Sequence, residues 1–150
     1  MHLPLEDSWW GAMIDKLKER KPGVQDESSL GALTQCAREG QCNLPHDKMN
    51  AAYRAALSHP NPTARLLAMY SDYTWNILHD QSLAERLIVM AVKTEPREAA
   101  YRITQIRLLL AQGRTQEAKV ALGDLQQLNI GGQLNPSIRE LRNSIALQDR

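Results

Sequence analysis

The sequence predicts an all-α fold, a right-handed superhelical solenoid of about eight helices packed as antiparallel pairs. Residues 80–88 and 114–122 align without a gap at a spacing of 34 residues, with Ala84 and Ala118 at the same place in each copy. This period, with a small residue in the second helix of each copy, is typical of stacked helix–turn–helix repeats. The chain also has few β-branched clusters and no Asn-Gly or Asp-Gly hairpin signal. The predicted helices are joined by two to eight residues, so consecutive helices should pack antiparallel.

The first helix is predicted to start at a cap provided by Asp7 or Ser8 and to end near Arg20. Its apolar residues recur at helical spacing, which places one face of the helix toward a core. A Pro-Gly pair within residues 21–26 then breaks the helix.

A second helix should start near Ser28 or Ser29 and stop at Gly40, and residues 43–47 connect it to a third. The third helix carries apolar side chains at positions i, i+3, i+4, i+7 and i+8, the spacing of a single buried helix face. The stretch 59–62, with two prolines, ends it.

Two Asn-Pro pairs mark the start of later helices. Asn61 is predicted to cap the fourth helix, with Pro62 at its first position, where a missing N–H costs nothing. Asn135-Pro136 repeats this signal before the last helix. The last five helices are predicted over 63–79, 81–94, 96–112, 115–128 and 136–148.

The whole chain, 1–150, is predicted to be a single domain, because 150 residues suffice for one core and the one candidate linker, 20–27, is too short to separate two. Its predicted parts are N-terminal helices over 8–60, repeats at about 65–98 and 99–132, and a closing helix over 136–148.

Composition and charge narrow the function. Apolar residues make up 43% and charged residues 23%, as in ordinary soluble domains, and the net charge is +1 with no polybasic arm. We therefore expect no nucleic acid as the main ligand.

The longest apolar run, 87–92, is too short to span a bilayer. Trp9 and Trp10 could anchor the first helix at a membrane interface, or one could be core while the other covers an exposed edge. The chain has no nucleophile elbow, phosphate loop or His-Glu-x-x-His motif, so we expect neither an enzyme nor a cofactor.

The second helices carry a family resemblance. The phrase 113–118, from Gly113 to Ala118, looks like the Gly-x-x-x-Glu-Ala turn of the tetratricopeptide repeat family, and Leu122 follows it in register. The preceding copy has the family's small, bulky, small and Pro positions at Ala84, Ile88, Ala91 and Pro96. The chain resembles this family over about residues 65–130. The resemblance implies a curved surface that binds a protein or peptide rather than a catalytic site.

In this family the first helices of the repeats line the concave face, which implies a partner-binding groove on the fourth and sixth helices. The candidate groove residues are Met69, Tyr70, Tyr73, Asn76, Ile103 and Arg107. The alternative is that these stripes pack against neighbouring helices as core. Arg107 is the one most expected to face a ligand, because burying an unpaired arginine is costly, and an acidic side chain or a C-terminal carboxylate would suit it.

Cys36 and Cys42 are separated by five residues across the end of the second helix. A disulfide would join the end of this helix to the start of the next and would place the domain in an oxidising compartment. The alternatives are two buried free thiols, or a zinc site completed by His46 and His59, although tetrahedral sites usually pair cysteines more closely. The spacing is not that of a redox-active Cys-x-x-Cys pair.

The order of these features along the chain is similar to the extracytoplasmic C-terminal domains of some bacterial inner-membrane proteins, including polysaccharide polymerases and glycan ligases. It runs from the Leu33 to Cys42 motif through Asn61-Pro62 and the segment 70–75 to the turn at Gly113. This resemblance implies a periplasmic location and a tether to the membrane through segments outside this chain, and a cytoplasmic location is the alternative.

We predict a protein-interaction module that binds a peptide or helix on its concave face. The alternatives are a non-catalytic periplasmic accessory domain of a glycan polymerase or ligase, and a self-assembling structural repeat. The oligomeric state stays open.

Overall fold

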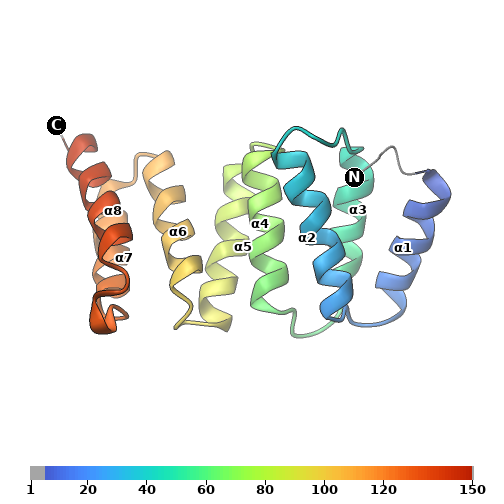
Figure 1. Cartoon of the computed structure of the whole chain (residues 1–150), viewed down its shortest axis with the longest axis horizontal. Coiled ribbons are helices and arrows are strands. Elements are labelled where there is room, and N and C mark those ends of the chain that lie inside the picture. Colours follow the sequence, from blue (N-terminus) through green and yellow to red (C-terminus); the bar gives the residue numbers. More distant parts are fainter. Residues whose placement is uncertain (1–5, 150) are drawn as a thin grey trace. The chain divides into compact units, whose positions relative to one another are not determined.

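The computed structural model describes residues 6–149, and all of their regular secondary structure is helical. Eight α-helices and one short 3-10 turn follow one another, with no strand among these residues, so the all-α prediction is confirmed (Figure 1). The chain divides into two compact units, an N-terminal unit that ends at Asp80 and a C-terminal unit that begins at Gln81. No helix within the described stretch is both long enough and apolar enough to cross a membrane.

The N-terminal unit contains four helices: α1 (Asp7–Glu19), α2 (Val24–Arg38), α3 (His46–Ala56) and α4 (Ala64–Asn76). Helix α1 packs beside α3, and α2 packs beside α4. Their largest fully buried side chains are Trp10, Leu17, Leu30, Met49, Tyr53, Leu66, Leu67 and Tyr73. Trp10 is buried, whereas the neighbouring Trp9 is 39% exposed. The pair therefore fits the alternative in which one tryptophan belongs to the core and the other covers an exposed edge.

Helix α2 begins at Val24, four residues before the predicted start near Ser28. The predicted break over 21–26 was therefore too long at its C-terminal end. Gly23 is extended and donates its N–H to the Asp26 carboxylate at 2.9 Å, and this hydrogen bond caps the first turn of α2. Asp26 also forms an ion pair with Lys16 of α1 at 3.2 Å. A capped start of this kind satisfies a backbone donor that would otherwise be left without a partner.

The start of α4 differs from the prediction for a similar reason. The cap is Thr63 rather than Asn61, because the Thr63 hydroxyl accepts the N–H of Leu66 at 3.1 Å. The same hydroxyl donates to the Glu27 carboxylate of α2 at 2.8 Å, and Glu27 is only 5% exposed. Asn61 instead has a positive φ of 56° and turns the chain ahead of Pro62. Thr63 therefore both starts α4 and partners a buried carboxylate.

Two other helices also start earlier than their predicted caps. Helix α1 is preceded by Glu6 with no side-chain cap, so that Asp7 and Ser8, the two predicted caps, both lie in the first turn. Helix α8 starts at Asn135, after Leu134, with Pro136 inside its first turn. Proline is tolerated there because the first backbone N–H groups of a helix have no partner within it.

Cys36 and Cys42 form a disulfide, which confirms the predicted pairing. Their Cα atoms lie 5.2 Å apart, and the N–H groups of Gln41 and Cys42 both reach the Cys36 carbonyl. Gly40 makes this tight return possible with a positive φ of 74°. Since both sulfur atoms are used, the free-thiol and zinc alternatives are wrong.

The C-terminal unit contains four helices and the 3-10 turn: α5 (Gln81–Thr94), α6 (Ala99–Ala111), α7 (Thr115–Gln126), η1 (Ile130–Gly132) and α8 (Asn135–Gln148). Each α-helix packs against the next, and α6 also packs against α8. Between α6 and α7 the chain turns at Gly113, whose φ of 71° suits the residue that follows a helix.

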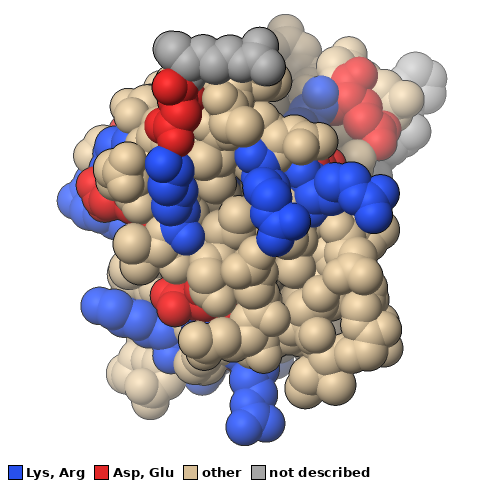
Figure 2. Space-filling view, turned by 90° about the vertical axis from the view of Figure 1, so that its left-hand side faces the viewer, with Lys and Arg blue, Asp and Glu red and all other residues tan. Residues whose placement is uncertain are grey.

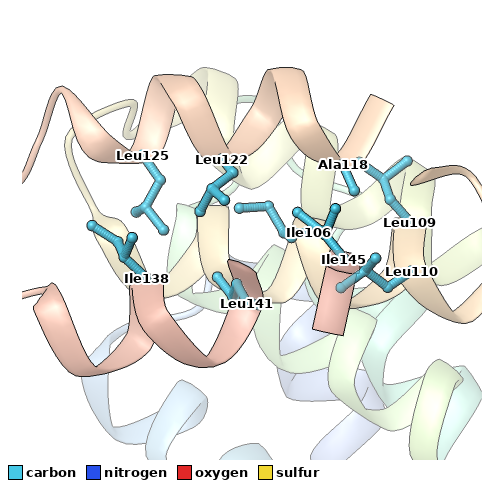
Figure 3. Close-up of a cluster of buried hydrophobic side chains, with 9 residues drawn as sticks. All are labelled: Ile106, Leu109, Leu110, Ala118, Leu122, Leu125, Ile138, Leu141 and Ile145. Carbon is cyan, nitrogen blue, oxygen red and sulfur yellow. The ribbon is translucent and has the colours of Figure 1, made fainter. Parts of the chain in front are cut away.

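The core of the C-terminal unit is aliphatic. Figure 3 shows side chains from α6, α7 and α8 pointing toward one another between the three helices: Ile106, Leu109, Leu110, Ala118, Leu122, Leu125, Ile138, Leu141 and Ile145. Ala84 and Ala118, the two small residues that the 34-residue spacing aligns, are both 0% exposed. A larger side chain at either position would meet a neighbouring helix.

Candidate binding cleft in the C-terminal unit

Two of the predicted groove residues lie in the core of the N-terminal unit. Tyr70 is 4% and Tyr73 is 0% exposed, as expected if the stripe packs against neighbouring helices. Tyr70 stacks on Tyr53 of α3 at 4.6 Å between ring centroids and donates its hydroxyl to Asn50 at 3.0 Å. Burial raises the pKa of Tyr73 to about 12. In this unit the two rings hold α3 and α4 together.

The other two groove residues predicted on α4, Met69 and Asn76, are more accessible than the two tyrosines. Met69 is half-buried, and its sulfur lies 3.0 Å from where a Cβ on Gly31 of α2 would stand. Asn76 is exposed, and its amide donates to the Asp72 carboxylate one turn earlier at 2.5 Å. Both side chains thus have contacts within their own unit.

The two groove residues predicted on α6 lie in the C-terminal unit. Ile103 is half-buried and packs against the aliphatic core. The Arg107 side chain is 47% exposed and forms an ion pair with Glu140 of α8 at 3.3 Å. A concave groove shared by α4 and α6 stays a prediction.

The C-terminal unit also has an open cleft of about 400 Å³ along α5, α6 and α7. Each helix contributes side chains one turn apart, so three helix faces line the cleft. The lining residues are Glu85, Val89, Gln105, Leu109, Glu117, Val120, Ala121 and Asp124. We call this the α5–α7 cleft.

The middle of the α5–α7 cleft is apolar. Leu109 of α6 is buried, while Val89 of α5 and Ala121 of α7 are half-buried. Val120 is 69% exposed, although it lies on the same helix as the buried Ala118. A lone exposed valine is unremarkable, but four apolar residues lining one concavity form a surface that a partner side chain can cover.

The α5–α7 cleft is acidic at both ends. At one end a single guanidinium serves two carboxylates: Arg114 donates to Glu85 at 2.6 Å and also pairs with Glu117. This contact holds the pKa of the Glu117 carboxyl below its usual value. At the other end, Asp124 has no hydrogen-bond or ion-pair partner within residues 6–149. Three carboxylates and one guanidinium leave this cleft with a charge of −2.

The α5–α7 cleft was not predicted, because the tetratricopeptide resemblance implies a binding surface on the first helices of the repeats, whereas α5 and α7 supply most of the lining of this cleft. A signal was present on a second helix. Residues 117, 120, 121 and 124 follow the i, i+3, i+4, i+7 spacing of one helix face, and that face does not include the core residue Ala118. The contribution of α5 and α6 could not be read from this pattern.

Comparison with protein-family models, with curated proteins and with solved structures finds no match to this chain. The tetratricopeptide resemblance therefore depends on the sequence motifs alone. Within residues 6–149, no three His, Cys, Asp or Glu side chains are grouped so that they could hold a metal ion.

Proposed function

We propose that this chain is a protein-interaction module and that its C-terminal unit binds a helical segment of a partner protein in the α5–α7 cleft. The observation that carries the proposal is the apolar middle of this cleft, where Val120 is 69% exposed above the buried Leu109. Covering such a surface with apolar side chains removes it from water and stabilises a complex. The proposal thus places the binding surface in a cleft lined by α5, α6 and α7, instead of on the predicted concave face formed by the fourth and sixth helices.

The dimensions suit a helix as the occupant. Residues 117 and 124 lie two turns apart on α7, which corresponds to about 10.5 Å at 1.5 Å per residue. A docked amphipathic helix presents anchors at i, i+3, i+4 and i+7 over the same length. A cleft of about 400 Å³ has room for the apolar side chains of such a helix.

The helix hairpins of the C-terminal unit support a second proposal, that the chain is built from superhelical repeats of the tetratricopeptide type. Ala84 and Ala118 are equivalent in the 34-residue spacing, and both are completely buried. In stacked repeats a small residue is required where neighbouring helices approach closely.

The Cys36–Cys42 disulfide supports a further part of the proposal, that the module works outside the cytoplasm. Disulfides persist in oxidising compartments and are reduced in most cytosols. Mass spectrometry of the protein isolated from its native host under alkylating conditions tests this, because two alkylated cysteines would contradict an extracytoplasmic location.

The binding proposal can be tested by selecting helical peptides from a phage-displayed library on the native protein and mapping the selected peptides by two-dimensional NMR. We expect the largest shift changes at Val89, Val120 and Asp124. Val120→Gln should weaken binding. Leu147→Gln is the matched control, because Leu147 of α8 is 63% exposed and lies outside the α5–α7 cleft. Selected peptides that bind both variants equally would contradict the proposal.

A further inference from the structure

We infer that the helix held in the α5–α7 cleft is cationic, with two basic residues seven positions apart and two adjacent apolar residues between them. This inference rests on the proposed function and adds the chemistry of the partner. In sequence terms the partner carries basic-x-x-apolar-apolar-x-x-basic, the complement of Glu117, Val120, Ala121 and Asp124 on α7.

The charge of the partner follows from the ion pairs at the ends of the cleft. Arg114 can neutralise only one of the two carboxylates it contacts, Glu85 and Glu117, so that end retains a charge of −1. Asp124 supplies the second negative charge at the opposite end. A basic side chain at each end of the docked helix gives both charges a partner, whereas an acidic one is repelled.

The spacing of the partner follows from the geometry of α7. Its two acidic residues in the cleft are separated by seven positions, with Val120 and Ala121 between them. Two helices packed side by side have the same rise per residue, so matching charges on the partner also fall seven positions apart. The apolar pair between them then faces Val120, Ala121 and the buried Leu109.

The rest of the C-terminal unit favours this placement. Residues 81–149 contain nine Lys and Arg and seven Asp and Glu, a net charge of +2, although the cleft itself carries −2. Figure 2 shows Lys and Arg side chains spread over the face of the C-terminal unit where α7 and α8 lie, with fewer Asp and Glu side chains among them. A cationic helix is repelled by that face and attracted by the cleft. Because binding at the basic face is unfavourable, the charges direct the helix specifically to the cleft.

The experiment uses three synthetic 15-residue peptides with the same apolar residues and either Lys, Gln or Glu at the two flanking positions. Fluorescence anisotropy measures their affinity for the full chain at low and high salt. We expect the Lys peptide to bind at least about tenfold more tightly than the Glu peptide at low salt, with the Gln peptide between them. The difference should shrink at about 0.5 M salt, where charges are screened over a few ångströms.

Two variants locate the effect. Asp124→Asn should weaken binding of the Lys peptide about twofold to fivefold, as expected for one exposed ion pair, and leave the Gln peptide unchanged. Glu95→Gln removes the same charge from an exposed residue outside the cleft and serves as the matched control. Val120→Gln, which alters no charge, should weaken all three peptides.

The outcomes separate this inference from the proposed function. If the three peptides bind equally and Val120→Gln weakens all of them, the cleft binds helices but the inferred charge is wrong. If the Lys peptide binds most tightly but Asp124→Asn and Glu95→Gln behave alike, the attraction is spread over the surface and the inference is overturned. If none binds, the inference fails, and failure of the unbiased peptide selection as well would overturn the proposed function.

Discussion

The two units of this molecule are stabilised in different ways. The N-terminal unit combines stacked tyrosines, a shared hydrogen bond of 2.5 Å between Thr34 and Tyr53, a buried Glu27–Thr63 contact and a disulfide. The core cluster of the C-terminal unit consists of Leu, Ile and Ala side chains from three helices. Specific polar and aromatic contacts define the first unit, whereas regular spacing of aliphatic residues defines the second.

This difference has a consequence for function. A core built from periodic aliphatic side chains needs only one face of each helix, so residues on the remaining faces are available for other contacts. In the C-terminal unit these include Val120 and Asp124 of the α5–α7 cleft. In the N-terminal unit the two α4 rings that were predicted to line a groove, Tyr70 and Tyr73, are used in its core.

The largest predicted effect tests the aromatic part of this comparison. Tyr53→Ala should destabilise the N-terminal unit by about 3–5 kcal/mol, because it removes a completely buried ring that contacts Tyr70 and Tyr73 and leaves a cavity. Tyr53→Phe is the matched control, since it keeps the ring and loses only the hydrogen bond with Thr34. Denaturant unfolding followed by near-ultraviolet circular dichroism checks both. Equal losses in the two variants would show that the hydroxyl, and not the stacked ring, holds this core.

The next effect tests the aliphatic part. Ala118→Trp should destabilise the C-terminal unit by about 1–3 kcal/mol or more, because Ala118 is completely buried between neighbouring helices and the larger ring overfills that space. Val120→Trp is the control on the same helix, since Val120 is 69% exposed, and it should change the melting temperature little. Thermal unfolding followed by circular dichroism distinguishes the two. If Ala118→Trp left the melting temperature unchanged, the assigned core face of α7 would be wrong.

The same contrast explains how much of the fold the sequence could predict. The predicted range 81–94 coincides with α5, and the predicted start of α7 at residue 115 is also correct, because apolar spacing and the turn at Gly113 define these elements. The boundaries that depend on a side chain reaching the backbone were missed. Examples are Asp26 at the start of α2 and Thr63 at the start of α4, where the nearby Pro and Gly suggested other positions.

The candidate site was harder to predict than the fold. A helical stripe such as Met69, Tyr70 and Tyr73 has the same spacing whether a neighbouring helix covers it or not, so its burial depends on packing that no local pattern reveals. The α5–α7 cleft needs side chains from three helices separated along the chain. The position of Val120 on α7 could be read from the sequence, but its neighbours Val89 and Leu109 could not.

The disulfide gives a smaller effect, confined to the N-terminal unit. Replacing both Cys36 and Cys42 by Ser should destabilise that unit by about 2 kcal/mol, the value expected from loop entropy for a short closed loop. The C-terminal unit should be unaffected, which hydrogen exchange of individual amides can show. Comparable loss of protection in α7 and in α2 would contradict the view that the two units are stabilised separately.

The smallest effect is a pH dependence at the start of α2. The Gly23 N–H, which donates to the Asp26 carboxylate, holds the pKa of Asp26 below its usual value of 3.8, and the nearby Lys16 ammonium lowers this pKa to a smaller extent. A lowered folded-state pKa contributes stability that is fully present above the unfolded value and is lost as the pH falls through the folded value. The N-terminal unit should therefore lose stability as the pH falls below about 4, and Asp26→Asn should reduce this loss. Melting curves at pH 7 and pH 3 measure it, with Asp15→Asn, an exposed carboxylate of α1, as the control. Identical acid sensitivity in the two variants would mean that the Asp26 carboxylate does not stabilise the capped turn, and that the early start of α2 depends on packing alone.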